Sequence, residues 1–89
     1  MRRSLPAGPF KRDFKRLEKR GWKVEKLQQT IFLLQSGELL PHIARPHKLS
    51  GKYDGLWECH IENDWLLIYS VTEKEVLLAR TGTHADLFE

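Results

Sequence analysis

Residues 56–81 decide the fold of this chain, and they read LWECHIENDWLLIYSVTEKEVLLART. Aromatic and aliphatic residues fill three segments, Leu56–Ile61, Trp65–Val71 and Val76–Thr81. The polar groups Glu62-Asn63-Asp64 and Thr72-Glu73-Lys74-Glu75 separate these segments and have the composition of turns. Short apolar segments joined by short polar turns predict a three-stranded antiparallel meander.

Upstream of the meander, apolar residues recur at helical spacing in two segments, from Pro9 to about Arg20 and from Val24 to the residues before Ser36-Gly37. The stripes are Phe10, Phe14 and Leu17 in the first segment and Val24, Leu27, Ile31 and Leu34 in the second. Gly21 supplies the stop between them. Two short helices with a tight turn predict an αα-hairpin packed on the sheet, which gives a two-layer α+β fold.

Two further segments flank the helical hairpin. Residues 2–5 have the composition of an edge strand that Pro6 would end. Residues 38–55 contain Pro41, Pro46 and two glycines, and they predict a long irregular connection of a kind that often carries function.

Length and composition bound the class of protein. The 89 residues are 40% hydrophobic and 30% charged, which predicts one globular domain over residues 1–89. No apolar run approaches the roughly 20 residues of a spanning helix, and the first residues lack the apolar core of a secretory signal. The single cysteine, Cys59, excludes an internal disulfide and suits the reducing cytoplasm.

Charge is distributed unevenly along the chain. Residues 1–52 carry 13 basic and 4 acidic side chains, whereas residues 53–89 carry 2 basic and 8 acidic ones. The basic run from Lys11 to Lys26 is typical of a solvated helix face with ion pairs, and equally of a surface for phosphates or for an acidic partner. The residues alone leave both interpretations open.

Alternation along the first predicted strand separates its side chains by chemistry. Trp57, Cys59 and Ile61 share one face, which we expect to pack against the helices, and Glu58 and His60 share the other. An acid and a histidine two residues apart are thereby predicted on the open face.

Histidines are frequent for a chain of this length. The candidates are His42, His47, His60 and His84, with Glu58, Asp64 and Arg80 as potential neighbours. If three of them converge at one end of the sheet, a base, an acid and a cation are available to cleave RNA through its own 2′-OH without a metal. Spacing alone favours the simpler interpretation, that these are scattered surface histidines.

A zinc site is disfavoured by the residue pattern. Cys59 and His60 are adjacent in a predicted strand and point to opposite faces, and no CxxC or HExxH spacing occurs. We therefore expect no metal or other cofactor, and we expect Cys59 to pack in the core.

Three motifs in order cover about residues 46–88: H-x-L-x-G from His47, E-x-H-I-x-x-D-W-x-L-I-Y from Glu58, and R-x-G-T-H-x-x-L-F from Arg80. On these motifs the chain resembles the YafQ-type toxins of the RelE/ParE superfamily, which belong to bacterial type II toxin–antitoxin systems. The helical half matches in pattern rather than in identities. Residues 4–9 depart from the family, because they are poorer strand material than its usual first strand.

The resemblance implies a microbial RNase fold and an mRNA interferase that cleaves message in the ribosomal A site. It also implies a cognate antitoxin that holds the toxin in a heterocomplex, and a cytoplasmic location with no membrane partner. The matching catalytic positions are His47, Glu58, His60, Asp64, Arg80 and His84, and the matching substrate-binding positions are Lys48, Trp65 and Phe88.

Our mechanistic hypothesis takes His84 as general acid, Asp64 or His60 as base, and Arg80 as the group that contacts the phosphate. His47 would orient the substrate or share in proton transfer, and Phe88 would stack on a base. Two alternatives remain at this point: a ParE-like toxin that binds gyrase without cleaving RNA, and a simple basic nucleic-acid-binding module.

Overall fold

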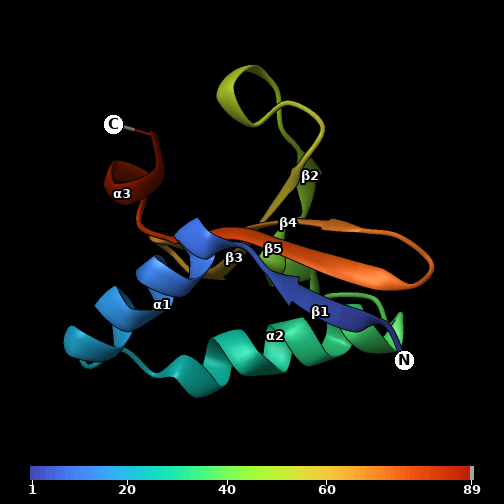
Figure 1. Cartoon of the computed structure of the whole chain (residues 1–89), viewed down its shortest axis with the longest axis horizontal. Helices are drawn as coiled ribbons and strands as arrows, with labels where there is room; N and C mark the ends of the chain where they lie inside the picture. The colour runs from blue at the N-terminus through green and yellow to red at the C-terminus, as the bar shows by residue number, and fades with distance from the viewer. Residues whose placement is uncertain (89) are drawn as a thin grey trace.

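The computed structural model describes residues 1–88, which form a five-stranded sheet with two long helices on one face (Figure 1). The strands lie in the order β1-β5-β4-β3-β2. The elements are β1 (Arg3–Pro6), α1 (Gly8–Lys19), α2 (Val24–Ser36), a 3₁₀ turn (His42–Ala44), β2 (His47–Lys48), a second 3₁₀ turn (Gly51–Tyr53), β3 (Trp57–Glu62), β4 (Trp65–Val71), β5 (Glu75–Gly82) and α3 (His84–Phe88).

The predicted meander is confirmed as β3, β4 and β5, which pair antiparallel. The N-terminal edge strand is also confirmed, and Pro6 is its last residue. It pairs parallel to β5, with Leu5 opposite Leu77. A parallel pair requires a long crossover connection, and here the two helices begin it.

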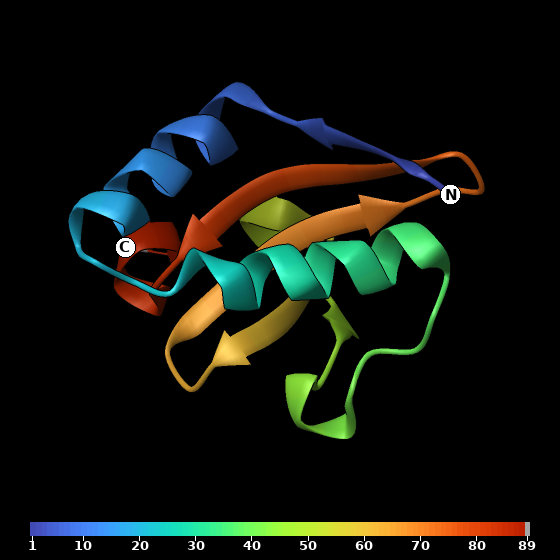
Figure 2. The ribbon, with the colours of Figure 1, turned by 90° about the horizontal axis from the view of Figure 1, so that it is seen from below.

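Seen from below, α2 lies across the near face of the sheet and α1 lies toward the edge formed by β1 and β5 (Figure 2). Phe10 and Leu17 of α1 and Leu27 and Leu34 of α2 are buried in the main core, as the two stripes predict. Gly37 closes α2 with φ 74°, a left-handed conformation that glycine adopts without steric cost.

The opposite face of the sheet is less open than predicted. A second apolar cluster covers part of it, built from Leu66 and Ile68 of β4, Leu87 of α3 and partly buried residues of segment 49–56. The short helix α3 and the strand β2 were not predicted, because each is too short to show a period in the sequence. Together with segment 49–56 they form a partial third layer above the sheet (Figure 1).

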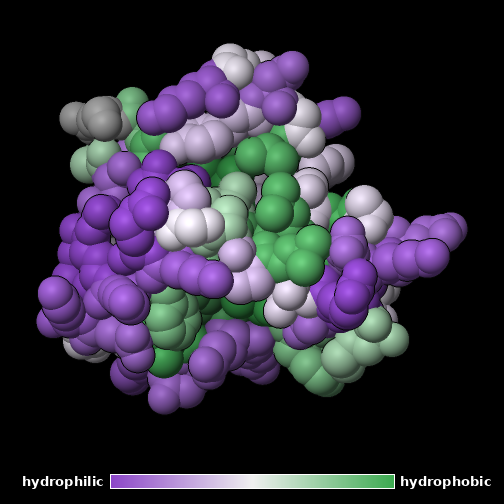
Figure 3. Space-filling model, in the orientation of Figure 1, coloured by the Kyte–Doolittle hydropathy of each residue, from purple (hydrophilic) through white to green (hydrophobic). Residues whose placement is uncertain are grey.

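Hydrophilic side chains gather over α1, on the left of the molecule in Figure 3, whereas apolar side chains lie nearer its centre. Among the helices of residues 1–88, none is both long enough and apolar enough to cross a membrane.

Candidate active site

Glu58 is the centre of one half of the candidate site. It lies on β3 directly opposite His47 of β2, and its side chain is only 5% exposed. Its Oε2 lies 3.3 Å from His47 Nε2 and 3.9 Å from His60 Nε2. The parity prediction for Glu58 and His60 holds, but the face on which they lie buries the Glu58 carboxylate between two imidazoles.

Both ring nitrogens of His47 face oxygen atoms. Nδ1 lies 3.2 Å from the carbonyl oxygen of Arg45, and Nε2 faces Glu58. The ring of His47 is therefore positioned from both sides, by the backbone of Arg45 and by the Glu58 carboxylate. His60 is less constrained: its Nδ1 is buried without a hydrogen-bond partner among the described residues.

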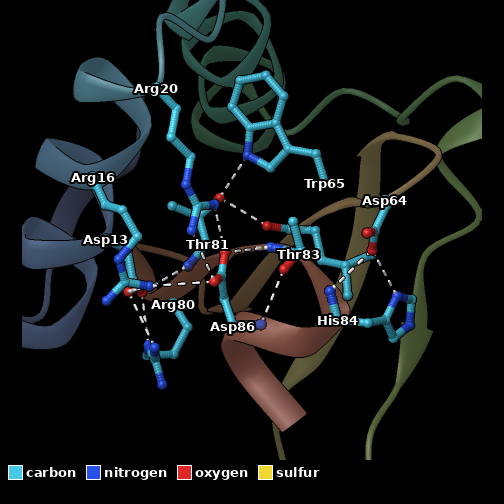
Figure 4. Close-up of polar contacts among 11 residues, drawn as sticks. Asp13, Arg16, Arg20, Asp64, Trp65, Arg80, Thr81, Thr83, His84 and Asp86 are labelled. Atoms are coloured by element: carbon cyan, nitrogen blue, oxygen red, sulfur yellow. Dashed lines mark hydrogen bonds and ion pairs between the residues drawn. The ribbon is translucent and has the colours of Figure 1, made fainter. Parts of the chain in front are cut away.

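The other half of the site consists of Asp64 and His84. Asp64 Oδ1 accepts the backbone N–H of His84 at 3.0 Å and lies 3.2 Å from its ring Nδ1 (Figure 4). The backbone hydrogen bond, followed by the side-chain one, lowers the pKa of Asp64. With Nδ1 bound to Asp64, Nε2 of His84 is the nitrogen left for a substrate.

The two halves face each other. The rings of His60 and His84 have centroids 6.4 Å apart, and the ring of Phe88 lies 5.8 Å from that of His84. The structure therefore brings together His47, Glu58, His60, Asp64, His84 and Phe88 from β2, β3, the β3–β4 turn and α3. Phe88 is 41% exposed, so its ring has a face available to a ligand.

Arg80 lies on the α1 side of this group and is held by Asp13. Its Nε and Nη2 donate to the Asp13 carboxylate at 2.7 and 3.1 Å, and its Nη1 donates to the Tyr53 hydroxyl at 3.2 Å. The hydrogen bond to Asp13 raises the pKa of Arg80. Tyr53 in turn packs edge-on against Phe88 at 5.3 Å, which links Arg80 to the histidine pair.

Sequence reasoning did not single out Asp13 or Tyr53. Asp13 is 2% exposed, and its carboxylate also accepts the backbone N–H of Thr81. A signal was present: Asp13 lies three residues after Phe10 and four before Leu17, so it belongs to the buried stripe of α1 and not to its basic face.

A second acid holds α3 in place. The Asp86 carboxylate accepts two hydrogen bonds from Arg20 at 2.8 and 3.1 Å and one from the backbone N–H of Thr83 at 3.0 Å (Figure 4). The hydrogen bond from Arg20 is the main reason that the pKa of Asp86 is lowered. A Cβ at Gly82 would lie 2.8 Å from Asp86 Oδ2, so this contact requires glycine there. We call the hydrogen bonds of Asp86 with Arg20 and Thr83 the Asp86 clasp. They fix the first turn of α3, which carries His84.

Two of the proposed substrate-binding residues lie apart from the histidines. Trp65 is buried in the helix-side core, where its Nε1–H donates to Thr81 Oγ1 at 2.9 Å, so its ring can act on the site only through its neighbours. Lys48 is exposed and pairs with Trp57, which places it on the strand face opposite to Glu58. Phe88 is the aromatic residue that meets the histidines.

Cys59 lies in the helix-side core, as expected for a packing residue. Burial, and then the charge of Glu58, raise the pKa of its thiol to about 12. Within residues 1–88, no three His, Cys, Asp or Glu side chains are grouped so that they could hold a metal ion.

The fold is that of a class of bacterial toxin. A sequence model of the family described as the bacterial toxin of type II toxin–antitoxin system, YafQ, matches residues 2–89. The chain belongs to this family.

Particular relatives agree with that assignment. The mRNA interferase toxin YafQ of Escherichia coli K12 is 40% identical over 83 residues, which cover 92% of this chain and 90% of the relative. The crystal structure of YafQ from E. coli BL21(DE3) is 37% identical, covers both chains fully and superposes with a TM-score of 0.93. A chain of the E. coli DinJ–YafQ toxin–antitoxin complex is 37% identical with a TM-score of 0.90, over 99% of this chain and 98% of that one.

Proposed function

We propose that this chain is an mRNA interferase that cleaves message in the ribosomal A site by attack of the RNA 2′-OH. Support comes from the curated relatives, which are named mRNA interferase toxins. The observation that carries the chemistry is the pair of facing histidines, His60 and His84, each with a carboxylate beside it. A base and an acid on two sides of one phosphodiester are the groups that this reaction requires.

In the proposed reaction His60 takes the proton from the 2′-OH as its oxygen attacks the adjacent phosphorus. The bond from phosphorus to the 5′-oxygen breaks, and His84 Nε2 gives its proton to that leaving oxygen. The products are a 2′,3′-cyclic phosphate and a 5′-hydroxyl. The 2′-oxygen is thus both nucleophile and the source of the proton that His60 receives.

The remaining residues take supporting roles. Asp64 holds Nδ1 of His84, so that Nε2 faces the substrate. Its lowered pKa makes the carboxylate a weak base, and we therefore assign the base role to His60. Arg80 supplies positive charge toward the phosphate, partly offset by Asp13, and His47 orients the substrate. Phe88 offers its exposed ring to a base.

The proposal also assigns partners and a location. A DinJ-like antitoxin would hold this chain inactive in a heterocomplex, as the E. coli relative is found in the DinJ–YafQ complex. The basic face of α1 suits either an acidic segment of that antitoxin or ribosomal RNA. Cleavage in the A site would place the protein in the cytoplasm, where translating ribosomes are.

Primer extension on a defined message in a reconstituted translation reaction tests the proposal. We expect cuts at fixed codon positions with the wild type, only slow residual cutting with His84→Ala, and no cuts when ribosomes are omitted. An intact message would overturn it. Gyrase copurifying with the chain would then favour the ParE-like alternative, and loss of activity on charge reversal of residues 11–26 alone would favour a basic binding module.

A further inference from the structure

A groove of about 590 Å³ lies beside the outer edge of β3, next to the candidate active site. We call it the Arg45 groove. Its size is within the range of small-ligand sites in proteins. Its lining includes His42, Ile43, Arg45, His60, Glu62 and Asn63. His60 lines the groove and also belongs to the proposed catalytic pair with His84. A ligand in the groove would therefore lie directly beside the cleaved bond.

The groove exists because β2 ends early. β2 pairs only with Trp57 and Glu58, so in the described structure the outer edge of β3 has no strand beside it from His60 onward. Arg45 turns the chain away with φ 45° and ψ 58°, a left-handed conformation that is uncommon for a residue other than glycine. The carbonyl oxygen of this same residue faces His47 Nδ1, so the turn that opens the groove also positions a site histidine.

The groove presents two nitrogen-bearing side chains that the fold does not use, one of them a guanidinium. Among residues 1–88, the side chains of His42 and Arg45 form no hydrogen bond or ion pair. The acid at the rim, Glu62, is paired with Lys26. The groove therefore offers a free guanidinium to an anion, with little competing negative charge.

The groove also has an apolar rim. Ile43 is 82% exposed and lies outside both core clusters. Asn63 adds an amide that can donate and accept hydrogen bonds. A free cation, an apolar surface and an amide in one groove match the phosphate, face and edge of a nucleotide.

We propose that the Arg45 groove binds the message nucleotide that flanks the cleaved bond, with Arg45 and His42 on its phosphate and Ile43 against its base. This inference rests on the proposed function. It makes Arg45 a substrate-binding residue that strengthens binding of the message without taking part in proton transfer. A groove that shares His60 with the catalytic pair favours RNA over the antitoxin as its occupant.

The test is single-turnover cleavage of message on programmed ribosomes over a range of toxin concentrations. We expect Arg45→Gln to raise the half-saturating toxin concentration about tenfold, because one charge-assisted hydrogen bond is lost. We expect the maximal rate to stay within about twofold of wild type, since Arg45 takes no part in proton transfer. Arg45→Lys keeps the charge and should lie between the two. Lys74→Gln is the matched control, because Lys74 is exposed in the β4–β5 turn, remote from β2.

A second arm identifies the phosphate. Messages carry one neutral methylphosphonate linkage, placed in turn on either side of the cut. At one of these linkages, the methylphosphonate should raise the half-saturating concentration of the wild type and of Lys74→Gln by about the factor that Arg45→Gln causes. The same linkage should not raise the half-saturating concentration of Arg45→Gln any further. If the effects of the neutral linkage and of Arg45→Gln on the half-saturating concentration multiply at every linkage tested, the proposal is overturned.

Other outcomes are separable. An active wild type with an Arg45→Gln variant that saturates identically overturns the groove alone. An Arg45→Gln variant that binds antitoxin more weakly but saturates normally with ribosomes would assign the groove to the antitoxin instead. A wild-type chain that leaves the unmodified message intact would overturn the proposed function itself.

Discussion

His84 is the residue whose surroundings say most about its role. One acceptor oxygen of Asp64 receives both its backbone N–H and its ring Nδ1, so backbone and side chain are fixed by the same atom. A ring held in this way presents Nε2 in a defined direction. His60 has no comparable support, because its buried Nδ1 has no hydrogen-bond partner among residues 1–88.

A prediction follows for Asp64. Asp64→Ala removes both hydrogen bonds to His84 and should lower the maximal cleavage rate roughly 100-fold, whereas Asp64→Asn keeps an acceptor oxygen and should cost roughly tenfold, the range usual for residues that orient a functional histidine. Single-turnover cleavage measures both. In the His84→Ala background neither change should cost more, because residues that act as a unit are not additive. A full further loss there would show that Asp64 is itself the base.

Cys59 should react slowly with alkylating reagents in the folded protein. Its thiol is buried and its pKa is raised to about 12, so the reactive thiolate is scarce at pH 8. We expect iodoacetamide to alkylate the native protein at least about 100-fold more slowly than the urea-unfolded protein. Rapid alkylation of the native chain, measured by mass spectrometry, would contradict the core packing of this residue.

At the scale of elements, α1 holds the site together from below. Two acids receive arginine side chains across element boundaries: Asp13 of α1 binds Arg80 of β5, and Asp86 of α3 binds Arg20 beside the end of α1. Helix α3 has a single turn and cannot be stable alone. Its position, and therefore that of His84, depends on the Asp86 clasp and on burial of Leu87.

The Asp86 clasp predicts a pH-dependent stability. The pKa of Asp86 is lower in the folded protein than in the unfolded chain. Its ionised carboxylate therefore adds to the free energy of unfolding above the ordinary aspartate pKa of about 3.9, and this contribution is lost as the pH falls toward the lowered pKa. Asp86→Asn should lower the free energy of unfolding by about 1 kcal/mol at pH 7. Urea unfolding at a series of pH values should show this difference shrinking below about pH 4.

Asp54→Asn is the control for that experiment, since Asp54 is exposed and outside any ion pair among residues 1–88. It should leave stability unchanged throughout. A difference between wild type and Asp86→Asn that is as large at pH 3 as at pH 7 would show that the carboxylate charge is not what holds α3.

Local patterns predict some elements of this chain and are silent on others. The strands β3 to β5 and both long helices follow from period and turn composition, and alternation places Cys59 and Glu58 on opposite faces. β2 has two residues and forms because His47 meets Glu58 across the sheet, a long-range pairing that no local pattern contains. No local pattern predicts the left-handed turn at Arg45 either, because arginine has no preference for that conformation.

The same distinction applies to the site. The three ordered motifs identify the candidate residues in the sequence. The proximity of His60 to His84, however, depends on α3 folding back over β4. Asp13 was visible as part of a helical stripe, yet an acid within a basic helix is more often solvated than buried. Its partner Arg80 lies 67 residues away, so the pair becomes evident only in three dimensions.

At the scale of the whole molecule, charge is distributed unevenly along the chain. The basic residues belong mostly to the first half of the chain, and hydrophilic side chains gather over α1 (Figure 3). The site histidines His47, His60 and His84 belong to β2, β3 and α3. A long-range electrostatic surface on one side and a small chemical site on another suit a protein that docks on a large polyanion and cleaves one bond.

The central claim is that the RNA supplies its own nucleophile between His60 and His84. The most direct test is cleavage, on programmed ribosomes, of a message with a single 2′-deoxy substitution immediately 5′ of the cut. The account predicts that this message survives, and that the all-ribose message yields a 2′,3′-cyclic or 3′-phosphate and a 5′-hydroxyl. Cleavage of the 2′-deoxy message at the normal rate would contradict it.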